Sequence, residues 1–214
     1  MPQPLKKQDR ATRADRPRDR ATTEALMVKA VGRLLARKGF KAVGVNAVAR
    51  EAGVDKVLIY RYFGGLTGLM KAFGLDRDFW PSAAELAGGA PEHFRALPLA
   101  DRMSALARNY LDAIRKRPVT QEIMGWELIE RNHLTAALED LREQRMVQFF
   151  KEFIPESDHH PDFLAISAIV GAAINYLVTR SRHTRFFSGV DLSQDAGWQS
   201  LLTTIDNLSK SLFR

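Results

Sequence analysis

The amino-acid sequence predicts an all-α protein, and two observations lead to that class. Apolar side chains recur every three or four residues through most of the 214-residue chain, which is the spacing of amphipathic helices. No segment alternates apolar and polar residues over the length of a strand. Glycines and prolines separate the periodic stretches, so we expect several helices of moderate length.

The first of these helices is expected to begin at Thr22 or Thr23, which would cap it, and to stop at Gly39. Its apolar stripe consists of Leu26, Ala30, Val31, Leu34 and Leu35. Later periodic stretches predict helices over Val45–Ala52, Asp55–Phe63, Thr67–Trp80, Leu99–Arg117, Val119–Phe153 (two helices, broken near Asn132 and His133), Asp162–Arg182 and Ala196–Phe213. Between them, Ser82–Pro98 is rich in Gly, Ala and Pro and predicts a loop with at most one short helix.

Basic residues are concentrated in the first third of the chain. Residues 1–74 contain 16 Lys and Arg against 6 Asp and Glu, whereas the other 140 residues contain 16 against 19. All of the formal net charge of +7 therefore arises at one end, which is typical of a segment that meets a polyanion. Charge alone leaves open a basic tail with no partner.

Residues 1–20 contain seven Lys and Arg, three Asp, and prolines at positions 2, 4 and 17, without apolar periodicity. This composition predicts a flexible basic arm, for which non-specific contact with phosphates is a reasonable role.

The chain has no Cys, which excludes disulfides, thiolate zinc sites and a thiol nucleophile. Its first residues, MPQPLKKQDR, lack the apolar core of a signal peptide. The longest apolar run, Phe163 to Val178, is interrupted by Ser167 and Asn175 and falls short of the roughly 18 to 20 apolar residues that a spanning helix needs. We therefore expect a cytoplasmic protein without membrane contact, in which this run forms a buried helix.

The segment Val45–Phe63 has the spacing of a DNA-binding helix-turn-helix. Ala49 is small where a second helix would cross close to the first, and Gly53 tolerates the positive φ of a tight turn. Val48, Val54 and Ile59 would fill the wedge between the two helices. This spacing lies inside the basic third of the chain.

The second of these helices would enter a major groove of DNA, with Asp55 as its N-cap. Side chains that would reach base edges or phosphates are Lys56, Val57, Tyr60, Arg61, Tyr62 and, on the preceding helix, Asn46. For Tyr60, packing in the core is an equally good interpretation, and for Phe63 it is the preferred one.

Residues 22–75 resemble the N-terminal domain of the tetracycline-repressor (TetR) family. The matching residues are Gly39-Phe40, Val48-Ala49, Ala52-Gly53-Val54, Ile59-Tyr60-Arg61-Tyr62-Phe63 and Leu69. Three positions depart from the family pattern: Asp55 replaces a serine, Val57 a glycine and Leu66 a phosphate-contacting lysine, for which Lys71 one turn later could partly substitute.

The resemblance implies a three-helix DNA-binding domain over residues 21–70 and a helical effector-binding and dimerisation domain over residues 71–214. In this family the last two long helices pair with their copies in a four-helix bundle. Small residues that would allow close approach are Ala165, Ala168, Gly171, Ala172 and Ala173, and the partner stripe is Leu201, Leu202, Ile205, Leu208 and Leu212. Core packing within one chain is the alternative for both sets.

The family also implies an effector pocket among the middle helices. The candidate ligand contacts are Tyr110, Trp126, His133, Phe150, Asn175 and Tyr176, although aromatic residues at helical spacing often form core. His159 and His160 are expected to be exposed in a turn, and His133 and His183 lack a partner at metal-ligand spacing, so no metal or cofactor is expected.

The resemblance implies a ligand-responsive transcriptional regulator, a homodimeric repressor that a small apolar or amphipathic effector releases from its DNA operator. The alternatives are an all-α enzyme and a ligand-independent DNA-binding protein. No nucleophile elbow, phosphate-binding loop, H-E-x-x-H or dinucleotide fingerprint occurs in the sequence, so an enzyme is not expected.

Overall fold

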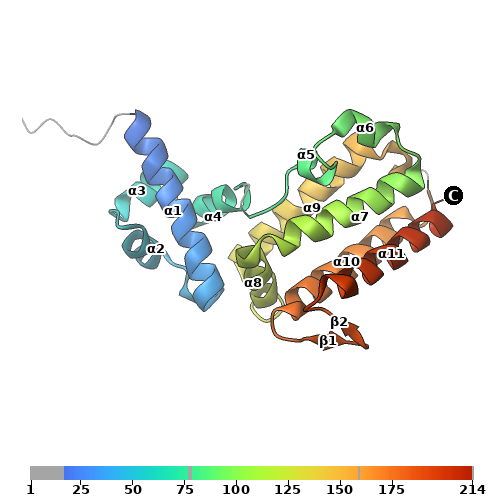
Figure 1. The fold of residues 1–214 in the computed structure, drawn as a ribbon. Coiled ribbons are helices and arrows are strands. Elements are labelled where there is room, and N and C mark those ends of the chain that lie inside the picture. The colour runs from blue at the N-terminus through green and yellow to red at the C-terminus, as the bar shows by residue number, and fades with distance from the viewer. Residues whose placement is uncertain (1–16, 77–78, 159, 214) are drawn as a thin grey trace, which may run out of the picture.

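The computed structural model describes residues 17–76, 79–158 and 160–213, and in these ranges the chain is almost entirely helical (Figure 1). The all-α prediction is confirmed. Residues 1–16 of the predicted basic arm lie outside the described residues. The N-terminal part contains α1 (Pro17–Lys38), a 3₁₀ turn (Phe40–Ala42), α2 (Val45–Ala52), α3 (Val57–Phe63) and α4 (Leu66–Gly74).

The C-terminal part forms a second group of helices, beside the first in Figure 1. Its elements are α5 (Ala83–Leu86), α6 (Pro91–Ala96), α7 (Leu99–Arg115), α8 (Pro118–Glu127), α9 (His133–Phe153), a 3₁₀ turn (Pro155–Asp158), α10 (Phe163–Ser181), β1 (Phe186–Phe187), β2 (Val190–Asp191) and α11 (Asp195–Leu212). Helix α7 packs against α8, α10 and α11, whereas α9 packs against α4 and α6. The two parts meet where α1 contacts α8 and α4 contacts α9.

Helix α1 begins at Pro17, earlier than the predicted start at Thr22 or Thr23. Proline suits the first turn of a helix because its missing N–H has no intrahelical acceptor there, and an ion pair of 2.8 Å between Arg20 and Glu24 follows one turn later. The buried stripe also differs by one residue. Met27 is fully buried, while Leu26 is 44% exposed, so including Leu26 in the core was wrong.

The segment after α4 leaves the helix sooner than its periodicity indicates. A helix was predicted to run to Trp80, but α4 ends at Gly74. Phe79 and Trp80 are instead buried against the C-terminal helices, and the Phe79 carbonyl accepts a hydrogen bond of 2.5 Å from Thr120 Oγ1. These tertiary contacts outweigh the local helical pattern.

The predicted loop Ser82–Pro98 contains two short helices, α5 and α6, so the expectation of at most one was wrong. The Ser82 hydroxyl accepts the Glu85 N–H at 3.2 Å and starts α5, and Pro91 starts α6. Each helix is anchored by one buried apolar side chain, Leu86 or Phe94.

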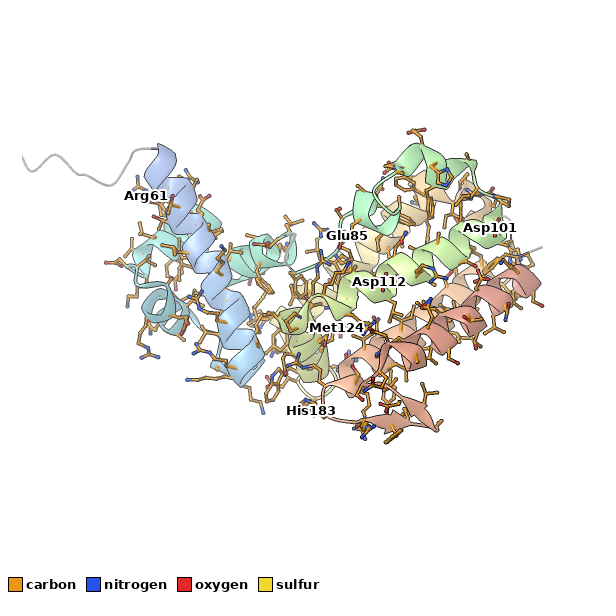
Figure 2. All side chains as sticks on the ribbon, in the orientation of Figure 1. Arg61, Glu85, Asp101, Asp112, Met124 and His183 are labelled. Atoms are coloured by element: carbon orange, nitrogen blue, oxygen red, sulfur yellow. The ribbon has the colours of Figure 1, made fainter. Side chains whose placement is uncertain are left out.

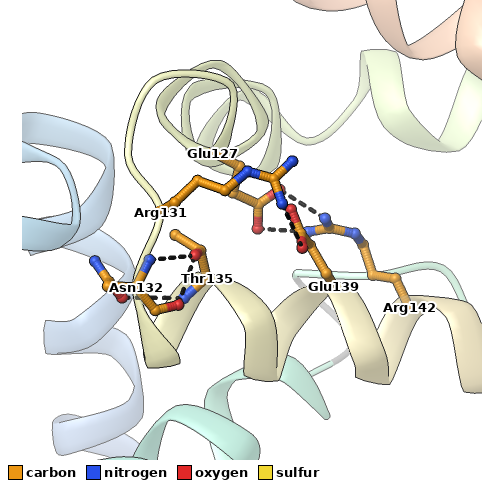
Figure 3. Close-up of polar contacts among 6 residues, drawn as sticks. All are labelled: Glu127, Arg131, Asn132, Thr135, Glu139 and Arg142. Carbon is orange, nitrogen blue, oxygen red and sulfur yellow. Dashed lines mark hydrogen bonds and ion pairs between the residues drawn. The ribbon is translucent and has the colours of Figure 1, made fainter.

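The predicted break near Asn132 and His133 is confirmed. The Asn132 side chain accepts the Thr135 N–H, and Thr135 Oγ1 accepts the Asn132 N–H, which forms a capping box at the start of α9 (Figure 3).

Helix α10 is mostly exposed in the single chain, contrary to the expectation of a buried helix. Of its residues, Phe163, Ile174 and Val178 are buried. An 18-residue window of this 19-residue helix has a mean hydropathy of 1.6, so by length and composition it is the one helix in the described ranges that could cross a membrane. The two-residue strands β1 and β2 then form a small hairpin before α11, which periodicity did not predict because each strand is too short to show alternation.

Candidate nucleic-acid interface and ligand cavity

The turn between α2 and α3 has the predicted geometry. Gly53 adopts φ 69° and ψ 31°, a left-handed conformation that side chains with a Cβ disfavour. The Val54 N–H donates to the Ala49 carbonyl at 3.0 Å across this turn. Val48 and Ile59 are fully buried between the helices, and the turn thereby fixes the direction of α3.

Helix α3 begins at Val57, two residues later than predicted, and Lys56 rather than Asp55 occupies the N-cap position. The Asp55 carboxylate still stabilises the start of the helix, because its Oδ1 accepts the Val57 N–H at 2.8 Å. Helix α3 then directs its polar side outward. Val57 and Tyr60 are 60% and 58% exposed, and Lys56 and Arg61 are also exposed. Figure 2 shows Arg61 at the edge of the N-terminal part, away from the C-terminal helices.

The remaining residues of this region differ in exposure. Asn46 on α2 is exposed. Tyr62 is half-buried, with the Arg20 guanidinium 4.9 Å from its ring centroid. Phe63 packs against the core, the interpretation preferred from sequence, whereas the exposure of Tyr60 argues against the core alternative for that residue. Leu66 is partly buried against the core and Lys71 is exposed.

Two basic side chains of α1 bind within the domain, a feature the sequence did not reveal. Arg33 and Arg37 donate to opposite oxygens of Glu51 at 2.8 and 2.7 Å. These hydrogen bonds lower the pKa of the Glu51 carboxyl below its ordinary value. The pair of arginines therefore holds α1 against α2 and leaves less of the basic excess for an external polyanion.

A cavity of about 790 Å³ lies among α7, α9 and α10, with Trp80 and the end of α11 completing its wall. Its volume is in the range of small-molecule sites. Three of the six predicted ligand contacts line it, namely Tyr110, Phe150 and Asn175.

The other three predicted contacts lie outside this cavity. Trp126 is at the junction with the N-terminal part, beside Gly39. His133 is exposed at the start of α9. Tyr176 is 48% exposed, with its ring 5.5 Å from that of Phe187.

The inner wall of the cavity contains a polar pair and a buried donor. Tyr110 donates from its hydroxyl to Asn175 Oδ1 at 2.6 Å, and burial raises the pKa of the Tyr110 phenol, which is therefore neutral. The Trp80 side chain is buried, and its Nε1–H has no hydrogen-bond acceptor among the described residues. Sequence periodicity missed Trp80 because it placed this residue at the end of a helix.

Arg142 connects the cavity to α8. It lines the cavity and donates to both carboxylate oxygens of Glu127 at 2.8 and 2.6 Å (Figure 3). Glu127 is 6% exposed, and burial raises the pKa of its carboxyl although the hydrogen bonds from Arg142 act in the opposite direction. This buried ion pair fixes α8 against α9.

Comparison with known proteins places these features in a family. The model of the N-terminal domain of bacterial regulatory proteins of the tetR family matches residues 28–73, which include the whole helix-turn-helix. Residues 28–73 therefore form an N-terminal domain of the tetR-family type. A comparison with curated proteins gives no match.

Solved structures of TetR-family regulators share the fold over nearly the whole chain. A TetR-family transcription regulator from Marinobacter aquaeolei is 16% identical, with a TM-score of 0.59 over 90% of this chain and 96% of that one. The fatty acid degradation regulator FadR from Bacillus halodurans is 13% identical, with a TM-score of 0.60 over 86% and 96%. NalD from Pseudomonas aeruginosa, the secondary repressor of the MexAB-OprM multidrug efflux pump, is 20% identical, with a TM-score of 0.57 over 88% and 95%.

A buried carboxylate links the N-terminal part to the C-terminal part, beside the packing of α1 on α8 and of α4 on α9. Glu130, which is 8% exposed, accepts the backbone N–H of Lys41 at 2.9 Å. Gly39 adopts φ 70° and ψ −175°, and a Cβ placed on it would lie 2.5 Å from Glu130 Oε1 and 2.8 Å from Trp126 Cδ2. The junction therefore requires glycine for both its conformation and its space.

We expect Gly39→Ala to lower the free energy of unfolding by on the order of 3 kcal/mol, because it combines a backbone region that favours glycine with a collision. Gly53→Ala is the matched control, since Gly53 also has positive φ, 69°, but no atom within 4 Å of its added Cβ. That variant should lose only about 1 to 2 kcal/mol. Urea denaturation of both variants measures the difference, and equal losses would show that the junction does not demand a small residue.

Among the described residues, no group of three or more His, Asp or Glu side chains gathers as a metal site would require. His160 is half-buried, with its ring 5.1 Å from that of Phe213, so the prediction that it is exposed was wrong because the C-terminus packs over it. His159 lies outside the described residues.

Proposed function

We propose that this chain is a ligand-responsive repressor that binds an operator as a homodimer and is released by a small apolar or amphipathic effector. The observation that carries the proposal is the exposed face of α3, where Lys56, Val57, Tyr60 and Arg61 lie together on a domain with basic excess. A short helix with this exposure can lie in a major groove and contact base edges and phosphates. The repressor role is that stated for NalD, which shares the fold.

Homodimer formation is supported by an exposed apolar surface on the last two helices. We call this surface the α10–α11 face, and its large side chains are 44 to 71% exposed: Ile169, Tyr176, Leu208 and Leu212. An apolar face of this kind on a soluble regulator marks an interaction surface. Dimerisation also suits the function, because two reading helices recognise the two halves of a symmetric operator.

We expect Ile169→Asp to shift the chain from dimer to monomer at micromolar concentration, because the carboxylate would be desolvated in the α10–α11 face. Ile129→Asp is the matched control: Ile129 is 75% exposed, against 71% for Ile169, but lies in the turn after α8. Native mass spectrometry reports the state of each variant. A monomeric wild-type chain, or equal dissociation of both variants, would contradict the proposed interface.

Release by an effector would follow from two connections between the cavity and the DNA-binding domain. Trp80, in the cavity wall, belongs to the segment that continues from α4. Arg142, also in the wall, holds Glu127 of α8, and the turn after α8 carries Glu130 to the Lys41 N–H. We infer that a ligand binding one arrangement of these elements more tightly shifts the population towards a spacing of the two α3 helices that does not fit adjacent grooves.

Selection of bound sequences from a random duplex pool by the pure protein tests this function. We expect an enriched, two-fold symmetric sequence whose half-sites are separated by about one helical turn, roughly 10 base pairs. Failure to enrich any sequence at low salt would overturn the proposal.

A further inference from the structure

We propose that the effector is an uncharged amphiphile, with an apolar body and one oxygen acceptor that receives the Trp80 N–H. This inference rests on the proposed function, because it specifies the ligand class of the cavity described above. It follows from three features of the described cavity wall: a buried donor without an acceptor, a single cation that is already paired, and an apolar lining.

Trp80 supplies the donor. Its side chain is 4% exposed and lines the cavity, and its Nε1–H has no partner among the described residues. Buried indole N–H groups normally find an acceptor, as Trp198 does by donating to the Leu192 carbonyl at 2.8 Å. An acceptor brought by a ligand would complete the hydrogen bonding of Trp80.

The charges of the wall disfavour an anionic head group. The charged lining residues are three carboxylates and one cation: Glu139, Asp140, Glu143 and Arg142. Both terminal nitrogens of Arg142 already donate to Glu127, and its guanidinium lies 5.5 Å from the Trp80 ring centroid. A carboxylate in this cavity would therefore find two uncharged donors, the Trp80 N–H and the hydroxyl of Ser167, and, within this described lining, no unpaired positive charge.

A cationic head group does not fit the part of the cavity wall beside Trp80 either. An ammonium group has donors but no acceptor, so it would leave the Trp80 N–H unsatisfied in a buried place. A ketone, ester or ether oxygen accepts a hydrogen bond without bringing a charge that must be desolvated. The neighbouring polar pair of Tyr110 and Asn175 is also uncharged.

The remainder of the cavity suits an apolar body. Its lining includes Met103, Leu106, Met146, Phe150, Ile174 and Phe213. Flexible methionines adapt to different apolar shapes, and a volume of about 790 Å³ accommodates a chain of ten carbons with space for a larger natural ligand.

Calorimetric titration with three compounds of ten carbons tests the class: 2-decanone, decanoate and decylammonium at neutral pH. We expect 2-decanone to bind at least about tenfold more tightly than either charged compound. Trp80→Phe keeps an aromatic ring but removes the N–H, and should weaken 2-decanone about five- to tenfold, as expected for loss of one hydrogen bond. Trp198→Phe is the matched control, because Trp198 does not line the cavity, and it should bind 2-decanone like the wild type.

Tighter binding of decanoate or decylammonium, equal weakening in the two tryptophan variants, or no binding of any of the three would overturn the inference. If Trp80→Phe does not fold, the order of the three affinities measured with the wild-type chain still tests the inference. The DNA selection is independent of this titration. If the chain enriches an operator but prefers decanoate, the proposed function stands and this inference is wrong. If the chain binds 2-decanone but enriches no DNA, only the proposed function is contradicted.

Discussion

Arg142→Met should lower the free energy of unfolding by about 3 to 5 kcal/mol at neutral pH, the loss expected when a buried ion pair is broken by removal of one partner. The substitution leaves Glu127, with 6% of its side chain exposed, without either of its two charge-assisted hydrogen bonds. Because this pair holds α8 against α9, we expect the loss to appear in global stability. Urea denaturation followed by circular dichroism measures it.

The same variant should depend on pH in a defined direction. Burial already raises the pKa of the Glu127 carboxyl, and removal of Arg142 raises it further. A group whose pKa is raised in the folded state binds its proton on folding, so its stability contribution is present at low pH and is lost as pH rises through the folded pKa. The deficit of Arg142→Met should therefore be larger at pH 8 than at pH 5.

Arg185→Met is the matched control for the ion pair. Arg185 binds Asp191 at 3.0 Å, but its side chain is 64% exposed, and exposed pairs contribute little. We expect a much smaller change that varies little over the same pH range. A similar loss in the two variants would show that burial does not give the pair of Arg142 and Glu127 its importance.

The double substitution Lys56→Ala and Arg61→Ala should weaken operator binding by roughly 100-fold or more, because each side chain contributes on the order of 1 to 3 kcal/mol if it contacts a base or phosphate. The slope of log K against log salt should also become shallower, by about one for each phosphate that the variant no longer neutralises. Fluorescence anisotropy with a labelled operator duplex at several salt concentrations measures both quantities.

The matched control removes two exposed lysines of the C-terminal part, Lys116 and Lys151. Its net charge equals that of the α3 double variant, so it separates binding at α3 from the overall charge of the protein. We expect it to retain nearly wild-type affinity. Equal weakening of both double variants would contradict the assignment of α3 as the reading helix.

Local rules sufficed to predict the helix-turn-helix from the sequence. Gly53 suits the positive φ of its turn, the Asp55 carboxylate accepts the first N–H of α3, and Val48 and Ile59 have the spacing of a buried wedge. All of these constraints act over fewer than fifteen residues, so the sequence displays them directly. The exposure of Lys56 and Arg61 then follows from the side of α3 that the wedge leaves outside.

The cavity was predicted only in part because its wall depends on tertiary packing. Tyr110 and Asn175 lie 65 residues apart and meet in a hydrogen bond. Trp80 was placed at the end of a helix, but the buried contact of Phe79 with Thr120 pulls its segment out of the helix and into the wall. Trp126 has the residue type of a ligand contact, yet it packs at Gly39 on the domain junction. Periodicity identifies which side of a helix is apolar but does not show whether that side meets core, cavity or a second domain.

An equilibrium salt titration tests the central claim most directly, with the wild-type chain binding its selected duplex and a scrambled duplex of equal length. The exposed α3 helices predict saturable binding of two chains per selected duplex, an affinity that falls linearly on a log–log plot as salt increases, and much weaker binding to the scrambled duplex. Equal affinity for the two duplexes, or no binding to either at low salt, would contradict the account.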